Sequence, residues 1–242
     1  MKITYIYHSC FVLEFDTLVC IFDYYKGKLP VFEKDKSIIF FASHKHQDHF
    51  VLEVFEYAKQ YNNVTYVLSN DIKLSPNYLL KHGINPEVKE KIISIGKNKE
   101  TTIEIDGERL TVETLRSTDA GVAFILSYKE KVVYHAGDLN WWSWAGETEE
   151  EYTQMTQGYV SEINKLEGRN IDLAFVVLDP RQEDRFWWGF DYFMRTTNTK
   201  VVFPMHCWGD YSIIDQLLQK EVAKPYKNKI ERINSENQSF EV

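Results

Sequence analysis

Residues 43–49 read Ser43-His44-Lys45-His46-Gln47-Asp48-His49, so three histidines and one aspartate fall within six positions. The apolar run from Ser37 to Ala42 comes directly before them, and its β-branched and aromatic residues predict a buried strand. A loop at the end of a strand can turn several side chains toward one point. Imidazole and carboxylate groups are ligands of zinc, iron and manganese. Only seven histidines occur in 242 residues, so this grouping indicates a metal site rather than a solvated polar loop.

The length and composition predict one α/β domain that spans residues 1–242, since no linker rich in Pro, Gly or Ser divides the chain. No apolar stretch is long enough for a transmembrane helix, and residues 1–8 resemble a strand rather than a signal peptide. The three cysteines, Cys10, Cys20 and Cys207, are an odd number, which argues against a disulfide framework. We therefore expect a cytoplasmic protein with no membrane partner.

The net charge of −8 argues against nucleic acid as substrate or partner. A nuclease needs a basic track to neutralise phosphates, whereas the lysines here are scattered and interrupted by acidic residues. A small-molecule substrate is the expectation.

The pattern His44-x-His46-x-Asp48-His49 resembles the metal-binding signature of the metallo-β-lactamase superfamily. The resemblance implies a four-layer αββα sandwich, in which two mixed sheets face each other, helices cover the outside and the metals lie at one edge. It also implies that His44 and His46 bind one metal, while Asp48 and His49 bind a second. The opening His8-Ser9-Cys10-Phe11 is similar to that of the ascorbate-6-phosphate lactonase-like branch of this superfamily.

Two further ligands are implied by the same resemblance. Asp138, in His135-Ala136-Gly137-Asp138, matches the family's bridging aspartate, and Gly137 would let the backbone approach the metals. A carboxylate between two dications stabilises both and holds them about 3.5–4 Å apart. His206 follows a late buried strand, where the family places its last ligand, and would complete the second metal site.

The sequence departs from the family at residues 117–119, where most relatives carry a histidine that completes the first metal site. Ser117, Thr118 and Asp119 stand there instead, and only Asp119 is a good ligand for a divalent metal. Asp119 replaces the histidine, or it is a turn residue and the first metal keeps fewer protein ligands. The number of bound ions is therefore one or two.

Three other residues have two interpretations each. Asp23 supports the metal-binding loop through hydrogen bonds, as in the family, or begins a turn. His8 has a structural role or contacts the substrate. Arg181 contacts a substrate anion or forms a surface salt bridge.

Two aromatic groups, residues 141–144 and 186–193, roof a substrate pocket or else belong to the core or to a homo-oligomer interface. His135 lies at the same strand end as Asp138 and could reach the pocket, so it is a weak candidate ligand.

The implied activity is metal-dependent hydrolysis by a metal-bound hydroxide. A divalent ion lowers the pKa of bound water from 15.7 toward about 7, and the hydroxide attacks a carbonyl or phosphoryl centre. Asp48 would touch both the second metal and the water, so it would orient the nucleophile and carry its proton. Zinc is the expected metal, with manganese or iron as the alternatives, and the resemblance favours a small lactone, ester or phosphoester.

Two alternatives to this function stay open. One is a nucleic-acid-processing hydrolase of the same fold. The other is a non-catalytic metal-binding or regulatory protein, which the missing third histidine favours and the presence of Asp48 disfavours.

Apolar spacing predicts helices over residues 50–61, 147–166 and 211–220. It places residues 91–94, 101–105 and 110–115 in a second sheet, and it predicts a terminal strand at 229–233.

Overall fold

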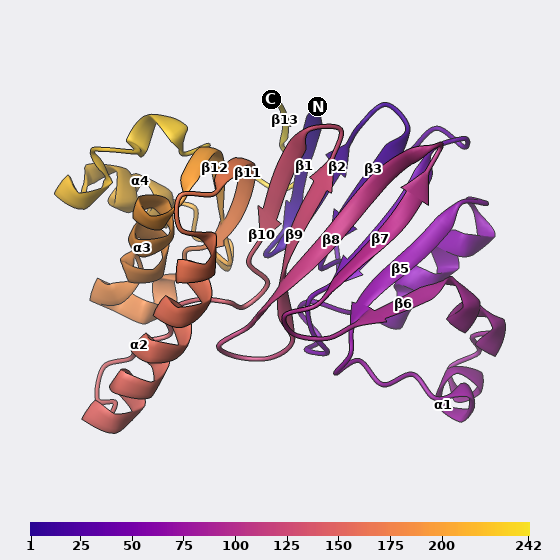
Figure 1. Cartoon of the computed structure of the whole chain (residues 1–242), viewed down its shortest axis with the longest axis horizontal. Coiled ribbons are helices and arrows are strands. Elements are labelled where there is room, and N and C mark those ends of the chain that lie inside the picture. The colour runs from indigo at the N-terminus through magenta and orange to yellow at the C-terminus, as the bar shows by residue number, and fades with distance from the viewer.

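A computed structural model describes residues 1–242 as two mixed β-sheets that pack face to face (Figure 1). The first sheet has seven strands in the order β13 (Ser239–Glu241), β1 (Lys2–Tyr7), β2 (Cys10–Glu14), β3 (Leu18–Phe22), β4 (Ser37–Ala42), β5 (Val64–Ser69) and β6 (Ile92–Ile95). The second has six, in the order β12 (Asn198–Met205), β11 (Asn170–Val177), β10 (Lys131–His135), β9 (Val122–Tyr128), β8 (Glu108–Arg116) and β7 (Glu100–Ile105).

Each sheet changes from antiparallel to parallel pairing along its width. In the first sheet β1, β2 and β3 are antiparallel, whereas β3 to β6 are parallel. In the second sheet β7 to β10 are antiparallel, whereas β10, β11 and β12 are parallel. Parallel strands need crossover connections, which are where the helices occur.

The central strands are buried on both faces, and this explains their nearly continuous apolar sequences. In β4, Ile39 and Phe41 face the other sheet within the main core, while Ile38 and Phe40 face outward into a second core. Side chains alternate across a strand, so two apolar layers need an apolar residue at every position.

Helices cover both outer faces. The first sheet is covered by the 3₁₀ helices η1 (Leu52–Lys59) and η2 (Pro86–Lys91) and by α1 (Pro76–Lys81), which share its outer core. Beside β11 and β12 lie α2 (Glu149–Ile163), α3 (Trp188–Thr196) and α4 (Ser212–Gln219), as Figure 1 shows. Short 3₁₀ helices complete the chain: η3 (Asn164–Leu166), η4 (Pro180–Arg185), η5 (Glu221–Ala223) and η6 (Lys227–Lys229). The four-layer αββα sandwich is thereby confirmed. None of the helices combines the length and apolar character needed to cross a bilayer.

Three predicted elements differ from the structure. Residues 92–95 form β6 at the edge of the first sheet, not the second, because they pair with β5. The terminal strand is β13 rather than 229–233, where Ile230 makes only an isolated bridge to Val202. The segment predicted as a helix over 50–61 is the shorter 3₁₀ helix η1.

One edge of the sandwich collects the ends of strands from both sheets. The turn after β1 and the connections after β3 and β4 come from the first sheet. The β8–β9 connection and the ends of β10, β11 and β12 come from the second. All the candidate residues of the sequence analysis lie in these connections.

Candidate metal centre

Asp23 anchors the loop that carries the histidine cluster. Its carboxylate is fully buried and accepts hydrogen bonds of 2.7 Å from both the backbone N–H and the hydroxyl of Ser43. It also accepts a hydrogen bond from Nδ1 of His49 at 2.8 Å. Because Nδ1 is engaged, Nε2 of His49 is turned away from Asp23 and toward the site. Asp23 therefore lies where it supports the loop of residues 43–49 through hydrogen bonds, which is the first of its two interpretations.

Two glycines allow the second sheet to approach this loop. A Cβ atom on Gly121 would lie 1.9 Å from the carbonyl oxygen of Ser43, and one on Gly137 would lie 2.6 Å from the Ser43 Cβ. Both glycines have a positive φ, which side-chain-bearing residues rarely adopt. The backbone N–H of Val122 donates a hydrogen bond of 2.9 Å to Ser43, so the β8–β9 connection is fixed against the loop.

Asp138 lies between the histidines of the two sheets. Its Oδ1 is 3.2 Å from Nε2 of His49 and 3.3 Å from Nε2 of His206, while its Oδ2 is 3.5 Å from Nε2 of His44. Burial alone would raise the pKa of Asp138, but His49 and His206 outweigh it and hold that pKa well below its ordinary value. The position suits a carboxylate that bridges two cations.

His44, His46 and Asp119 form the outer part of the cluster. Nε2 of His44 is 2.9 Å from Nδ1 of His46, which is 3.6 Å from Oδ2 of Asp119. The hydroxyl of Ser43 contacts Nδ1 of His44 at 2.9 Å and leaves its Nε2 facing the cluster. The side chains of His46 and Asp119 are each 47% exposed. The structure thus brings Asp119 beside His46, within one group of possible donors that also holds His44 and Asp138.

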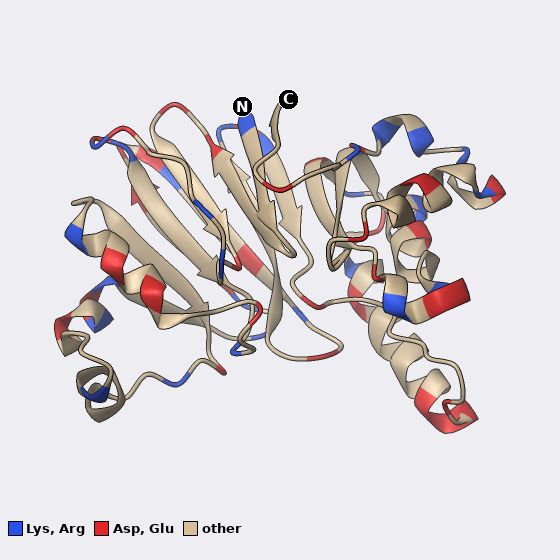
Figure 2. Ribbon diagram, turned by 180° about the vertical axis from the view of Figure 1, so that it is seen from behind, with Lys and Arg blue, Asp and Glu red and all other residues tan.

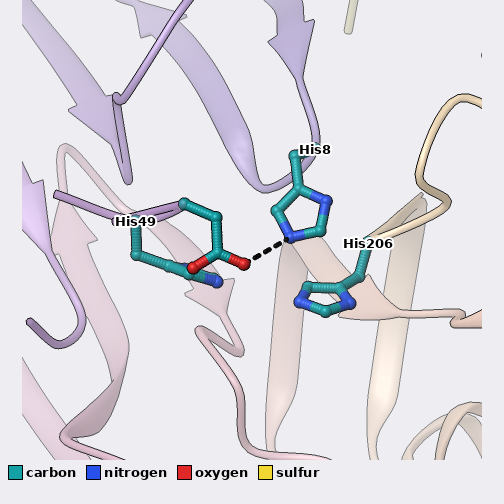
Figure 3. Close-up of side chains that lie close together, drawn as sticks. His8, His49 and His206 are labelled. Atoms are coloured by element: carbon teal, nitrogen blue, oxygen red, sulfur yellow. Dashed lines mark ion pairs between the residues drawn. The ribbon is translucent and has the colours of Figure 1, made fainter. Parts of the chain in front are cut away.

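His8 and Asp48 complete the inner part of the cluster. His8 is fully buried in the turn after β1, and its Nε2 lies 3.6 Å from Oδ2 of the partly exposed Asp48 (dashed line in Figure 3). Figure 3 shows the rings of His8, His49 and His206 gathered around this carboxylate. Burial, followed by His206 and His49, lowers the pKa of His8 to about 2, so this imidazole is neutral. A neutral imidazole is the form that binds metals.

Several buried polar atoms of the cluster have no hydrogen-bond partner: Nε2 of His49, Nε2 of His206, Oδ1 of Asp138 and both ring nitrogens of His8. Buried polar groups are normally paired, because an unpaired one costs about 1–3 kcal/mol. Two ligand atoms about 2.1 Å from a tetrahedral ion lie about 3.4 Å apart. The observed separations of 3.2–3.5 Å around Asp138 match that value. The residues present therefore fit one or two divalent ions.

Asp179 is a residue of the site that the sequence analysis did not identify. Its buried carboxylate accepts a hydrogen bond of 2.7 Å from Nδ1 of His206, which directs Nε2 toward Asp138. Its position just past the buried strand β11, similar to that of Asp23 after β3, is the signal that could have indicated it.

His135 is buried close to the cluster but is structural. Its Nε2 contacts the carbonyl oxygen of Ser9 at 2.9 Å, and its Nδ1 accepts the N–H of Gly137 at 3.1 Å. Both ring nitrogens are therefore engaged, and neither is free to bind a metal.

The cluster opens into a cavity of about 360 Å³. Trp142, Trp144, Trp208 and Arg181 line it together with His46, Asp48, Asp119, Asp138 and His206. The group at 141–144 thus contributes two rings to the pocket, whereas Trp188 packs against Trp141 away from it. Arg181 lies over the Trp208 ring at 4.6 Å and donates hydrogen bonds from Nε and Nη2 to Asp179.

Comparisons with known proteins agree with this fold. Residues 2–154 match the model of a family described as the beta-lactamase superfamily domain. No curated protein sequence matches the chain.

Solved structures share the fold at low sequence identity. Igni18, a metallo hydrolase from Ignicoccus hospitalis, is 16% identical with a TM-score of 0.60, over 100% of this chain and 98% of that one. The isothiocyanate hydrolase from Delia radicum gut bacteria is 14% identical with a TM-score of 0.57, over 100% and 99%. CmlA, a diiron β-hydroxylase from Streptomyces venezuelae, is 11% identical with a TM-score of 0.62, over 100% of this chain and 54% of that one.

These likenesses establish the fold alone, so the reaction has to be inferred from the residues of the site. With its family match over residues 2–154, its facing mixed sheets and its histidine–aspartate cluster at their edge, the chain belongs to the metallo-β-lactamase superfamily and has the fold of its metal-dependent hydrolases.

Proposed function

We propose that the chain hydrolyses a small lactone, ester or phosphoester at a centre of one or two divalent ions, with zinc as the first choice and manganese or iron as alternatives. The observation that carries this proposal is the convergence of unpaired buried atoms of His49, His206 and Asp138, of which His206 and Asp138 line an open pocket. Histidine and carboxylate together are a donor set for these metals. When bound, such ions polarise a water molecule and the substrate oxygen.

His44, His46 and Asp119 would hold one ion, and Asp48, His49 and His206 the other, with Asp138 between them. Asp23 and Asp179 fix two of the imidazoles in the orientation that exposes Nε2 to the centre. Ligands held in this way need little rearrangement when the ion binds.

Asp48 is the proposed catalytic residue. It lines the pocket and is partly exposed, so its carboxylate can accept a hydrogen bond from a water in the cavity. It would orient that water toward the substrate and take its proton. A positioned general base of this kind contributes about 10²- to 10⁴-fold in rate.

The pocket walls support a small substrate. Three indole rings line the cavity, and Arg181 is the only Lys or Arg that does so. Because Asp179 engages Nε and Nη2 of Arg181, Nη1 is left for an oxygen of the substrate. Lys and Arg are dispersed over the ribbon in Figure 2 and form no continuous track, which weighs against a nucleic-acid substrate.

A hollow of about 660 Å³ along α2 shares Thr118 and Met155 with this cavity. It provides room for a substrate group that extends beyond the reacting bond.

The first test is elemental analysis of protein purified without added metal. About two equivalents in wild type, falling to one in Asp119→Ala, are expected. One equivalent in both proteins would reject the two-ion form of the proposal.

The second test is hydrolysis of a panel of chromogenic lactones, esters and phosphoesters by metal-loaded protein. Asp48→Asn should lose at least about 100-fold in kcat. Asp35→Asn, which changes an exposed carboxylate remote from the pocket, is the matched control. A metal-loaded wild type without turnover on any of the panel would favour the non-catalytic metal-binding alternative.

A further inference from the structure

The inner part of the cluster contains one more imidazole than the resemblance assigned to it. His8 was expected to be structural or to contact the substrate, yet its Nε2 belongs to a group with Asp48, His49 and His206 whose donor atoms all lie within 4.8 Å of one another. The other group consists of His44, His46, Asp119 and Asp138.

The surroundings of His8 leave its ring without any hydrogen bond. The ring is fully buried, its centroid lies 3.9 Å from that of His206 and 4.3 Å from that of Trp208, and neither nitrogen has a partner. A buried histidine that serves only to fill space normally pairs at least one nitrogen, as His135 does with both. An unpaired Nε2 that lies near the Asp48 carboxylate and near the unpaired Nε2 atoms of His49 and His206 indicates a shared cation.

The backbone holds His8 in this place against its own preference. His8 and His206 both have left-handed conformations, with φ of 56° and 68°. The N–H of His206 donates a hydrogen bond of 3.2 Å to the carbonyl oxygen of His8, and the N–H of His8 donates one of 2.9 Å to the hydroxyl of Tyr5. Residues outside glycine adopt this conformation rarely, and such strain is concentrated at functional sites.

We propose that the imidazole of His8 is an additional ligand of the inner ion, which makes the inner position the tighter one of an asymmetric pair. This inference rests on the proposed metal centre. The inner ion has five candidate donors, three of them buried imidazoles: His8, Asp48, His49, Asp138 and His206. The outer ion has four candidate donors, His44, His46, Asp119 and the shared Asp138, and two of them, His46 and Asp119, have side chains that are nearly half exposed.

The test is a titration of chelator-treated protein with Co²⁺ and Zn²⁺, in competition with a chromophoric chelator. Wild type should show two classes of site that differ in affinity. His8→Gly removes the imidazole and suits a positive φ. It should lower the affinity of the tight class by at least ~10- to 100-fold, because loss of a hydrogen-bond partner of a metal ligand already lowers affinity by that much. His46→Ala should weaken the loose class and leave the tight class unchanged.

The visible absorption of bound Co²⁺ gives a second readout that does not depend on turnover. Its intensity decreases as coordination number rises, so His8→Gly should change the spectrum of the first equivalent of Co²⁺, and His46→Ala should not. His8→Asn, which tolerates the left-handed backbone, should act in the same direction and guards against misfolding of the glycine variant. His82→Gly, at an exposed histidine after α1, is the matched control.

The outcomes separate this inference from the proposed function. Unchanged tight-class affinity and spectrum in both His8 variants, with loss in Asp138→Asn, would overturn the assignment of His8 and leave the metal centre standing. Failure of wild type to bind either ion would overturn both.

Discussion

The carboxylate of Asp179 contacts Nδ1 of His206 at 2.7 Å and, through the same oxygen atom, also accepts a hydrogen bond from Arg181. One buried group therefore positions an imidazole of the candidate metal centre and the only Lys or Arg that lines the pocket.

Asp179→Asn should lower the affinity for Zn²⁺ by about 10- to 100-fold, because the amide cannot accept the His206 proton as strongly and the imidazole loses its fixed orientation. Competition with a chromophoric chelator measures this change. Asp172→Asn alters an aspartate within β11, which pairs with Lys200 away from the site, and should bind as wild type does. Equal affinities in all three proteins would contradict a positioning role for Asp179.

The same carboxylate should make the metal-free protein sensitive to acid. Burial would raise the pKa of Asp179, but hydrogen bonds from His206 and Arg181 outweigh it and lower the pKa to about 2, from an ordinary value of 3.8. Between these values the unfolded state binds more protons than the folded state, so stability is lost as the pH falls. The difference in free energy of unfolding between wild type and Asp179→Asn should shrink by about 2 kcal/mol from pH 5 to pH 2.

Denaturant unfolding in the presence of a chelator, at a series of pH values, measures this difference. A constant difference over the whole pH range would show that the pKa of Asp179 is not lowered in the folded state.

The close approach of the two sheets at Gly121 should be costly to disturb. Gly121→Ala would place a methyl group 1.9 Å from the carbonyl oxygen of Ser43, in addition to the strain of a φ of +65°. We expect a loss of at least about 3 kcal/mol in the free energy of unfolding. Gly107→Ala has a φ of +82° but no atom within 4 Å of the new methyl group, so it should lose only about 1 kcal/mol. Urea unfolding measures the loss of stability in both variants, and the difference between the two losses is the contribution of the contact with Ser43. Equal losses would show that this contact contributes nothing.

Arg181→Gln should distinguish anionic from neutral substrates. The guanidinium faces the pocket, so its loss should raise KM by about tenfold for an ester that carries a carboxylate and leave KM nearly unchanged for a neutral analogue. Arg109→Gln, at an exposed position on β8, serves as the control. Because Arg181 also contacts Asp179, the metal content of each variant has to be measured alongside. An equal rise in KM for both esters would assign Arg181 a structural role only.

The sequence was most informative where the relevant residues are neighbours in the chain. The buried strand before Ser43 and the loop after it are local features, so the position of the histidine cluster followed from residues 37–49. Asp138 was indicated by a local pattern too, the Gly-Asp after a strand that resembles the position of the family's bridging aspartate.

Contacts between strands that are distant in the chain could not be predicted in the same way. The contact of Asp179 with His206 depends on the parallel pairing of β11 with β12, and that of His8 with His206 depends on the meeting of both sheets at one edge. The edge strands β6 and β13 were misplaced because a short strand with one neighbour carries little pattern of its own. Helical spacing also does not distinguish the i+3 bonds of η1 from the i+4 bonds of an α-helix.

The candidate centre takes its donors from both sheets: His8 and the loop of residues 43–49 belong to the first, and Asp119, Asp138 and His206 to the second. A cation among them would act as a crosslink between segments about two hundred residues apart in the chain. Its binding energy would then add to the free energy of folding, so the melting temperature would report metal occupancy even in a variant that has lost all turnover.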